Sequence, residues 1–265
     1  MKNFDSAVTY ASYLKVNELL SLQSPRSSGP EHDEMLFIVV HQTYELWFKC
    51  VLHELARAQQ LLELGDTHSS LPVLGRVRTI FKVLVSQVDI LETMTPLQFN
   101  SFRDRLEAAS GFQSVQFREL EAVLGRRDKS MVDHLEPNSE PQQRVQSAMN
   151  RPALFDSVIS YLTKRGHKMP MAATTRDFSE QYEANEEVQE SLANTYRNDP
   201  EAAMMLERLI DIDEGLQEWR YRHVKMVERT IGMKHGTGGS SGAAYLASTL
   251  FKPTFPDLWA VRSRF

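Results

Sequence analysis

The spacing of hydrophobic residues along the chain is that of amphipathic helices over most of its length. Between residues 33 and 63, apolar side chains recur every three or four positions, which places them on one face of a helix. A second helix is expected over residues 72–93, with Pro72 near its start, where a missing N–H costs little. Another long helix is expected from Pro200 to about Ile231.

Shorter segments between the long helices also carry helical patterns. Further helices are expected from Thr95-Pro96 onward and over residues 112–124, 152–165 and 180–197. Residues 126–150 are polar and contain prolines, which predicts a connection that holds one short helix. Strand-like alternation is scarce. The chain is therefore predicted to be all-α, a single-domain helical bundle that spans residues 1–265.

The composition narrows the class of protein without changing this prediction. Hydrophobic residues make up 42% of the chain and charged residues 25%, which suits a folded protein with a sizeable core. The net charge of −5 argues against a nucleic-acid binder and against a protein held on an anionic membrane surface. No apolar run approaches the roughly 20 residues of a membrane span, no signal-peptide core is found, and the single Cys50 fits a reducing compartment. We therefore expect a cytoplasmic protein without a nucleic-acid or membrane partner.

A glycine-rich stretch, KHGTGGSSG, follows the last long helix at residues 234–242. Its spacing excludes a Walker phosphate loop, because the lysine comes first, and a dinucleotide motif, because the third glycine of that motif falls on Ser241. Two interpretations remain from the pattern. The stretch is either a helix cap with a flexible surface loop, or a loop whose bare backbone approaches a ligand. In the second case Thr237 offers a hydroxyl to that ligand.

Two histidines lie within the apolar stripes of long helices, His41 in the first and His223 in the last. Each is either a core histidine with a polar neighbour or a functional group, such as a ligand to a metal or a haem iron. The H-E-x-x-H and Glu-x-x-His patterns of zinc and di-iron helices are absent from the sequence. A metal would therefore have few protein ligands, which favours a prosthetic group.

Arg103 and Arg118 lie in a segment that mixes apolar and charged residues, FRDRLEAASGFQSVQFRELE. Each is either part of a solvated helix face or a bidentate partner for a carboxylate. Together with the histidines, they predict a helical protein with a candidate anion site. They do not predict a reaction.

Five segments, in this order, resemble the tryptophan 2,3-dioxygenase family. They are TYASYL at 9–14, HDEMLFIVVHQTYELWFK at 32–49, ETMTPLQFNSFRDRL at 92–106, SGFQSVQFRELE at 110–121 and WRYRHVKMVERTIGMKHGTGGSSG at 219–242. The resemblance implies an all-helical, cytoplasmic homotetramer with one haem b in each subunit. It further implies an enzyme that inserts both atoms of O2 across the indole C2–C3 bond of L-tryptophan and releases N-formylkynurenine.

The resemblance also implies roles for the haem-binding residues. His223 would be the proximal ligand of the haem iron, and Ser110 would lie near the haem edge. His41 would be the catalytic distal histidine, close to the indole N–H and the bound oxygen. Ferrous haem needs one axial ligand and one open position, which a single helix-borne histidine can provide.

Substrate-binding roles follow from the same resemblance. Within one subunit they fall on Phe37, Phe99, Arg103 and Thr237. A neighbouring subunit would contribute Tyr10, Tyr13 and Leu14. Residues 1–30 are therefore expected to form an N-terminal arm that contacts the next subunit.

Departures from the family pattern, which include Tyr44 and His235, keep a second function open. Val40 stands where a glutamine is usual beside the distal histidine, and YASYL replaces the commoner Tyr-Gly-Gly-Tyr-Leu. The alternative is a homologous haem oxygenase that inserts one or two oxygen atoms into a substituted indole or tryptophan derivative. Arg103 and Thr237 suit an amino acid substrate and so favour L-tryptophan.

Overall fold

The computed structural model describes residues 7–29, 31–107, 109–236 and 242–265, and every regular element within these ranges is a helix. The α-helices are α1 (Tyr10–Leu14), α2 (Val16–Leu19), α3 (His32–Leu64), α4 (Thr67–Leu91), α5 (Pro96–Arg103), α6 (Val115–Leu124), α7 (Glu140–Met149), α8 (Leu154–Lys164), α9 (Met171–Thr174), α10 (Glu186–Asn198), α11 (Pro200–Ile231), α12 (Ala243–Ala247) and α13 (Pro256–Ala260). Short 3₁₀ helices are η2 (Asp104–Leu106), η3 (Gly111–Gln113), η4 (Lys129–Val132) and η5 (Val261–Arg264). The all-α prediction is confirmed. None of the described helices combines the length and the apolar character that crossing a membrane requires.

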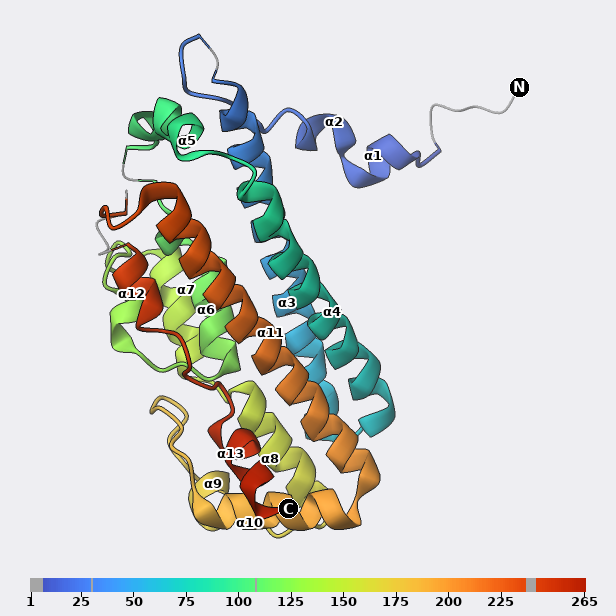
Figure 1. Cartoon of the computed structure of the whole chain (residues 1–265). Helices are drawn as coiled ribbons and strands as arrows, with labels where there is room; N and C mark the ends of the chain where they lie inside the picture. The colour runs from blue at the N-terminus through green and yellow to red at the C-terminus, as the bar shows by residue number, and fades with distance from the viewer. Residues whose placement is uncertain (1–6, 30, 108, 237–241) are drawn as a thin grey trace.

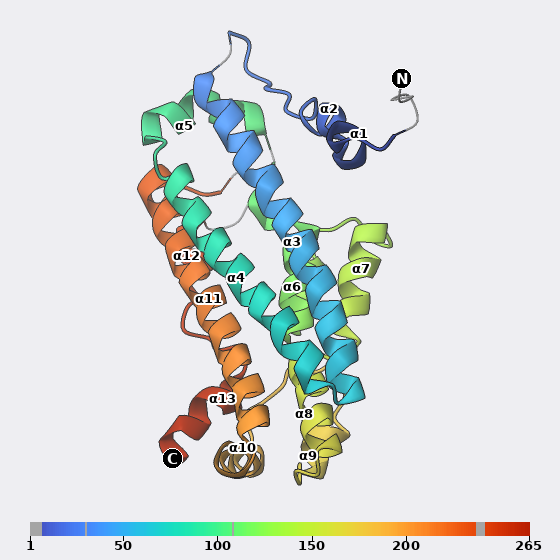
Figure 2. The same cartoon turned by 90° about the vertical axis from the view of Figure 1, so that its right-hand side faces the viewer.

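Three long helices, α3, α4 and α11, form the frame of the molecule (Figures 1 and 2). α4 packs against both α3 and α11, while α8 packs against α3 and α10 lies across the lower end of the bundle. The inward face of α4 shows why these helices associate, because its buried residues recur every three or four positions. Among them are Val77, Phe81, Leu84, Val88 and Leu91. This frame holds the two helices on which the candidate histidines lie.

The start of α4 differs from the predicted one. The helix begins at Thr67 and not at 72, because the Asp66 side chain caps it by accepting a hydrogen bond from the Ser69 backbone N–H at 2.9 Å. Pro72 therefore lies inside the helix, within its second turn. The one backbone hydrogen bond that this proline cannot form is tolerated because α4 packs along both α3 and α11.

Two other segments also depart from the prediction. α10 begins at Glu186, later than the predicted 180, because the Asn185 side chain caps it there. Residues 126–150 contain the predicted short helix, which is α7, and in addition the 3₁₀ helix η4, which was not predicted. Met131 and Val145 pack together there in a small second core. The predicted bounds of α11 are confirmed.

A buried carboxylate attaches the C-terminal segment to α11. The Asp213 side chain is fully buried. Its Oδ2 accepts hydrogen bonds from the backbone N–H of Thr254 at 2.9 Å, the backbone N–H of Phe255 at 3.3 Å and the indole N–H of Trp259 at 2.8 Å. The last part of the chain is thereby fixed along the helix that carries His223.

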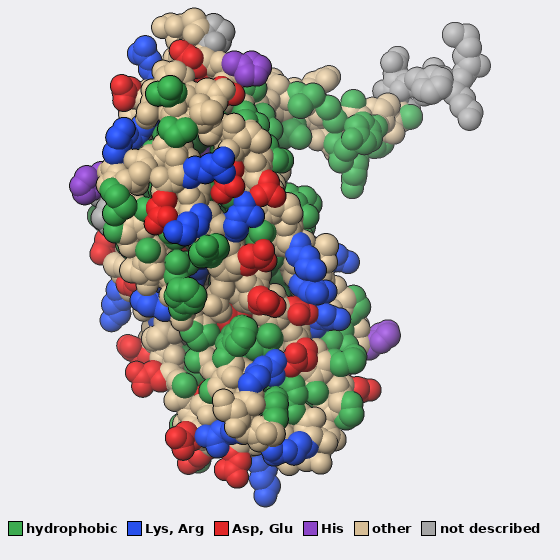
Figure 3. Space-filling view, viewed as in Figure 1, with side chains coloured by type: hydrophobic (Ala, Val, Ile, Leu, Met, Phe, Trp, Pro, Cys, Tyr) green, Lys and Arg blue, Asp and Glu red, His purple; other side chains and the backbone are tan. Residues whose placement is uncertain are grey.

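The described part of the predicted N-terminal arm, with α1 and α2, projects away from the bundle (Figure 1). Its hydrophobic side chains are exposed, and Figure 3 shows them gathered on the projecting segment. Tyr10 and Tyr13 are 79% and 76% exposed. The arm contacts the body through the Gln23 side chain, whose amide donates to Gln42 Oε1 at 2.6 Å.

Candidate functional site

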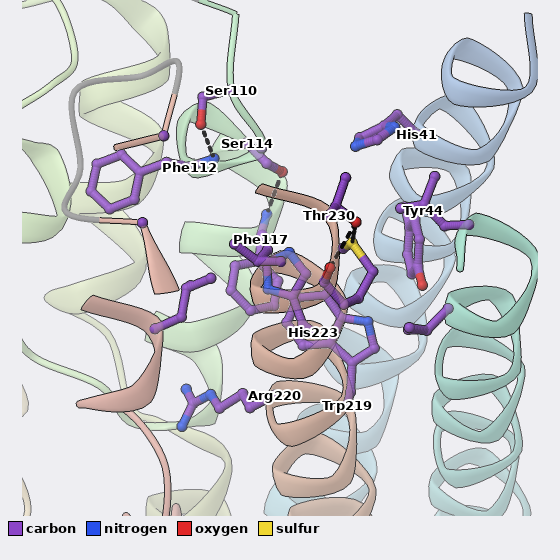
Figure 4. Close-up of a pocket in the computed structure, with 18 of the residues that line it drawn as sticks. His41, Tyr44, Ser110, Phe112, Ser114, Phe117, Trp219, Arg220, His223 and Thr230 are labelled. Carbon is purple, nitrogen blue, oxygen red and sulfur yellow. Dashed lines mark hydrogen bonds between the residues drawn. The ribbon is translucent and has the colours of Figure 1, made fainter. Parts of the chain in front are cut away.

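One cavity brings together residues of α3, α5, α6 and α11, and residues of α12 and of the segment before α6 also line it (Figure 4). Most of its wall is apolar, formed by Phe37, Phe48, Val88, Leu91, Met94, Phe99, Leu106, Phe112, Phe117, Trp219, Met226, Val227, Ile231 and Leu246. The charged and imidazole side chains in the wall are His41, Glu45, Arg103, Arg118, Glu121, Arg126, Arg220 and His223. An apolar cavity with a few converging polar groups is typical of a small-molecule or cofactor site.

His41 of α3 and His223 of α11 both line this cavity. Burial lowers the pKa of His41. Burial also lowers the pKa of His223, to about 4, and the charges of a protonated His41 and of Arg118 act in the same direction. Both imidazoles are therefore neutral at neutral pH, which is the form that binds a metal or accepts a hydrogen bond.

The tautomer of His41 follows from its hydrogen bond. His41 Nδ1 lies 2.7 Å from the backbone oxygen of Phe37, one turn earlier on the same helix. A carbonyl oxygen can only accept, so Nδ1 carries the proton and donates it. The lone pair is therefore on Nε2. His41 is thus prepared to accept a hydrogen bond from an N–H group of a ligand.

The indole ring of Trp219 orients His223 by stacking on its imidazole. Its imidazole is stacked on the indole of Trp219, with centroids 5.0 Å apart and planes inclined by 14°. Trp219 in turn packs against Phe117, at a centroid distance of 4.9 Å, and is buried. No residue in the described part of the chain hydrogen-bonds His223. A ring nitrogen of His223 is thus available to a ligand in the cavity.

Arg103 lies at the C-terminal end of α5 and lines the cavity together with Phe37 and Phe99. The two phenyl rings are 5.7 Å apart, centroid to centroid, and form part of its aromatic wall. Arg103 Nη2 donates a hydrogen bond to the backbone oxygen of His235 at 2.8 Å. The predicted carboxylate partner is therefore in the cavity, and one of its donors binds the backbone at the start of the glycine-rich stretch.

The two ends of the glycine-rich stretch lie against each other. Gly242 has φ +63°, and a Cβ at this position would lie 2.6 Å from the backbone oxygen of Lys234. Both the conformation and the close approach require glycine here. Gly236 and Gly242 line the cavity, as the ligand-approach interpretation predicts. Thr237 lies outside the described residues.

The remaining predicted residues fall in two places. Ser110 lines the cavity and caps η3, where its Oγ accepts from the Phe112 backbone N–H at 3.3 Å. That bond uses an oxygen lone pair, so the hydroxyl proton can be donated to a ligand. Tyr10, Tyr13 and Leu14 do not line the cavity of their own chain, because α1 belongs to the projecting arm.

An arginine cluster in the cavity wall was not identified from the sequence. The Glu121 carboxylate accepts hydrogen bonds from Arg118 at 2.5 Å, Arg126 at 3.0 Å and Arg220 at 2.9 Å. Burial alone would raise the pKa of Glu121, but the charges of the three arginines hold it below its ordinary value. Arg118 is 5% exposed, so its interpretation as part of a solvated helix face is wrong. The spacing of Arg118 and Glu121 was visible in the sequence, whereas the contact with Arg220 was not.

The chain is similar to known proteins over almost its whole length. The model of the family described as tryptophan 2,3-dioxygenase matches residues 1–151 and 192–265. A tryptophan 2,3-dioxygenase of Herpetosiphon aurantiacus is 56% identical over 259 residues, which cover 97% of this chain and 98% of the relative. Those of Anaeromyxobacter dehalogenans and Caulobacter vibrioides are 58% and 46% identical, each over 97% of this chain and over 96% and 98% of the relatives. The chain therefore belongs to the tryptophan 2,3-dioxygenase family.

Proposed function

We propose that the protein is a haem-dependent dioxygenase that cleaves the indole C2–C3 bond of L-tryptophan with O2 and releases N-formylkynurenine. The observation that carries the proposal is that two neutral histidines, His41 and His223, face one aromatic-lined cavity from different helices, with Arg103 in the same wall. The same reaction is supported by relatives named tryptophan 2,3-dioxygenase, which are similar to this chain over nearly their whole length.

The residues of the cavity fit a haem b. His223 presents a neutral imidazole from the long helix α11, and a haem iron needs one such axial ligand. Within the described residues, no group of three or more histidine, cysteine, aspartate and glutamate side chains could hold a metal ion. A porphyrin would supply the ligands that the chain does not. Bound haem would supply the chemistry of O2, while the protein provides binding, orientation and exclusion of water.

The chain's own residues would orient the substrate. Phe37 and Phe99 would contact the indole ring, and His41 Nε2 would accept a hydrogen bond from the indole N–H. Arg103 would pair with the carboxylate, for which its planar guanidinium is suited. Thr237 would bind the amino acid end of the substrate. These contacts would hold the indole C2–C3 bond in one orientation, and correct positioning of the reactants lowers the barrier of such a reaction.

A neighbouring subunit would complete the site. Tyr10, Tyr13 and Leu14 are exposed on an arm that extends from the body of the chain, and exposed apolar groups of this kind mark interaction surfaces. We therefore expect residues 1–30 to reach the cavity of another copy, while the rest of the chain acts as one haem domain. The assembly would be a cytoplasmic homotetramer with one haem b in each subunit, and Ser110 would lie near the haem edge.

The activity is tested with the purified protein reconstituted with haem and reduced. On addition of L-tryptophan and air, the near-ultraviolet absorbance of N-formylkynurenine is expected to rise. A normal haem spectrum without this product would contradict the proposal. A product of an indole derivative carrying one added oxygen atom would point instead to an oxygenase of substituted indoles.

The role of His223 is tested separately with His223→Ala. This variant is expected to lose the haem spectrum of the parent protein, because no other described residue of the cavity offers an imidazole on α11. His41→Ala is the matched control in the opposite wall. It is expected to bind haem normally and to turn over L-tryptophan slowly.

A further inference from the structure

A buried carboxylate holds the base of the N-terminal arm. Glu34, in the first turn of α3, is only 2% exposed. Its Oε1 accepts a hydrogen bond from the backbone N–H of Arg26 at 2.7 Å, and its Oε2 accepts from the backbone N–H of Ser27 at 3.0 Å and from the Ser27 hydroxyl. Both carboxylate oxygens therefore bind the chain at the point where the arm joins the body.

The same hydrogen bonds keep Glu34 ionised. Burial alone would raise its pKa, but the hydrogen bonds from Arg26 and Ser27 and the charge of Arg105 hold the pKa below its ordinary value. A buried carboxylate is costly when its oxygens lack donors, so releasing Arg26 and Ser27 would be unfavourable. The base of the arm is thus firmly attached to α3.

A second attachment lies two turns further along α3. The Gln23 side-chain amide donates to Gln42 Oε1 at 2.6 Å, and the Gln42 amide donates to the backbone oxygen of Leu22 at 3.1 Å. Glu34 and Gln42 are eight residues apart on α3, or about 12 Å along the helix axis. Two attachments at this distance fix the direction of residues 22–27 and not only their position.

The direction of the arm depends on these polar contacts because its apolar side chains remain exposed. Leu19, Leu20 and Leu22 are 39%, 69% and 61% exposed. α1 and α2 extend away from the bundle in both views of the molecule (Figures 1 and 2). Apolar packing against its own body therefore does little to hold the arm.

We propose that Glu34 is a positioning residue for the cavity of a neighbouring subunit. The inference rests on the proposed function, in which Tyr10 and Tyr13 of one copy complete the site of another. Because Glu34 holds Arg26 and Ser27, it sets the direction in which the arm leaves its own body. An arm without this contact samples many directions, and only a fraction of them brings its tyrosines to the neighbouring cavity.

The test uses mixed assemblies in which one chain supplies the arm and the other supplies the cavity. The arm donor carries His41→Ala, and the cavity donor carries Tyr10→Ala and Tyr13→Ala. The two chains are coexpressed with different affinity tags and isolated together with bound haem. Each chain alone is expected to turn over L-tryptophan slowly, whereas the mixed assembly should regain turnover because one kind of site has both parts.

Glu34→Gln is then placed in one chain or in the other. In the arm donor it is expected to raise KM for L-tryptophan about tenfold, since hydrogen bonds to a charged acceptor are lost and the new amide group cannot accept from an N–H. In the cavity donor it should leave KM unchanged. A disturbance of α3 would have the opposite pattern, because Glu34 is seven residues before His41 on that helix.

Two further variants support the comparison. Ser27→Ala removes a donor to Glu34 without changing α3, so in the arm donor it should raise KM in the same direction by a smaller factor. Glu54→Gln is the matched control, because Glu54 is another buried glutamate of α3 but pairs with Arg76 of α4 at 2.6 Å. It should leave KM unchanged in either chain.

Amide hydrogen exchange measures the contact without activity. In Glu34→Gln, the backbone N–H groups of Arg26 and Ser27 should exchange faster than in wild type, while exchange in the rest of α3 stays the same. Equal exchange at these two positions would overturn the inference. Faster exchange throughout α3 would also overturn it, since Glu34 would then stabilise the helix and not the arm.

The outcomes separate the inference from the proposed function. An equal rise in KM with Glu34→Gln in either chain, or no rise in both, overturns the inference while shared sites stand. A mixed assembly no faster than its parents, beside an active wild type, would show that the arm does not complete a neighbouring site, and the inference would fail with it. An inactive wild type would refute the proposed reaction, and hydrogen exchange would then decide whether Glu34 fixes the arm.

Discussion

The imidazole of His223 lies face to face with the indole of Trp219, four residues earlier on α11. Side chains at this spacing occupy the same side of a helix, so α11 itself fixes their relative position. Phe117 of α6 packs against the indole of Trp219, so the stacked pair is also held in place relative to α6. The proposed iron ligand is thereby oriented through aromatic packing.

Removal of the Trp219 ring should weaken both the fold and the iron ligand. Trp219→Ala is expected to lower the free energy of unfolding in urea by about 3–5 kcal/mol, as for other buried aromatic residues. In the haem-bound protein it should also shift or broaden the iron–histidine band in the resonance Raman spectrum. Trp219→Phe keeps a ring face and should change both quantities less. Equal iron–histidine bands in all three proteins would show that the stack does not orient His223.

Arg103 should distinguish substrates by their carboxylate. Arg103→Leu is expected to lower kcat/KM for L-tryptophan about a hundredfold, or about 3 kcal/mol, because a buried charge would lose its partner. Tryptamine lacks the carboxylate, so its turnover should hardly change. Steady-state kinetics with both amines measures the difference. A similar loss for both would mean that Arg103 acts through the backbone of His235 and not through the substrate.

Gly242 should be required for activity because its backbone lies too close to the Lys234 backbone oxygen to leave room for a side chain. In Gly242→Ala the new methyl group would meet the Lys234 backbone oxygen, so the ends of the glycine-rich stretch must separate. We expect at least about a tenfold loss in kcat/KM with unchanged haem binding, since closing segments complete such sites. Gly166→Ala is the control, because Gly166 also has positive φ but nothing within 4 Å of the new group. It should cost about 1–2 kcal/mol of stability and leave activity intact.

The stability of the fold should depend on pH through Asp199. Hydrogen bonds from Arg165 are the largest cause that holds the pKa of this carboxyl below its ordinary value of 3.8; burial opposes them, and the Ala202 N–H and His167 add to them. A lowered pKa stabilises the folded state above the unfolded-state value, and this stabilisation is lost as pH falls through the folded value. Asp199→Asn should therefore reduce the free energy of unfolding by about 2 kcal/mol at pH 7. The difference between the two proteins should shrink below about pH 4. A difference that stays constant down to pH 3 would contradict this role.

Much of the fold was predictable because the signals are local. The bounds of α11 follow from Pro200 at its start and from a stripe of apolar residues at three- and four-residue spacing. The start of α4 differs from the predicted one because Pro72 indicates a first-turn position, whereas the helix begins directly after the Asp66 cap, at Thr67, five residues before Pro72. Periodicity shows where a helix is amphipathic, but caps decide where it begins.

The site was predictable in part. His41, His223 and Arg103 come from three helices, and their apolar surroundings marked them before the structure showed that they line one cavity. Their placement in one site was predicted from the resemblance to the family and not from their spacing in the sequence. The pairing of Glu121 with Arg220, 99 residues apart in sequence, follows from the packing of α6 and α11 and has no local signal. Thr237 stays a prediction.

The carboxylate of Asp213 has a consequence for the order in which the protein is made. Synthesis completes α11 well before residues 254–259, which supply the three donors to Asp213 Oδ2. Until then the carboxylate cannot be buried without leaving a charge unpaired, which is strongly unfavourable. The part of α11 around Asp213 is therefore expected to stay solvated until residues 254–259 pair with it. The helix that presents His223 would settle fully into the bundle only then, which would make the proposed haem site one of the last parts of the chain to form.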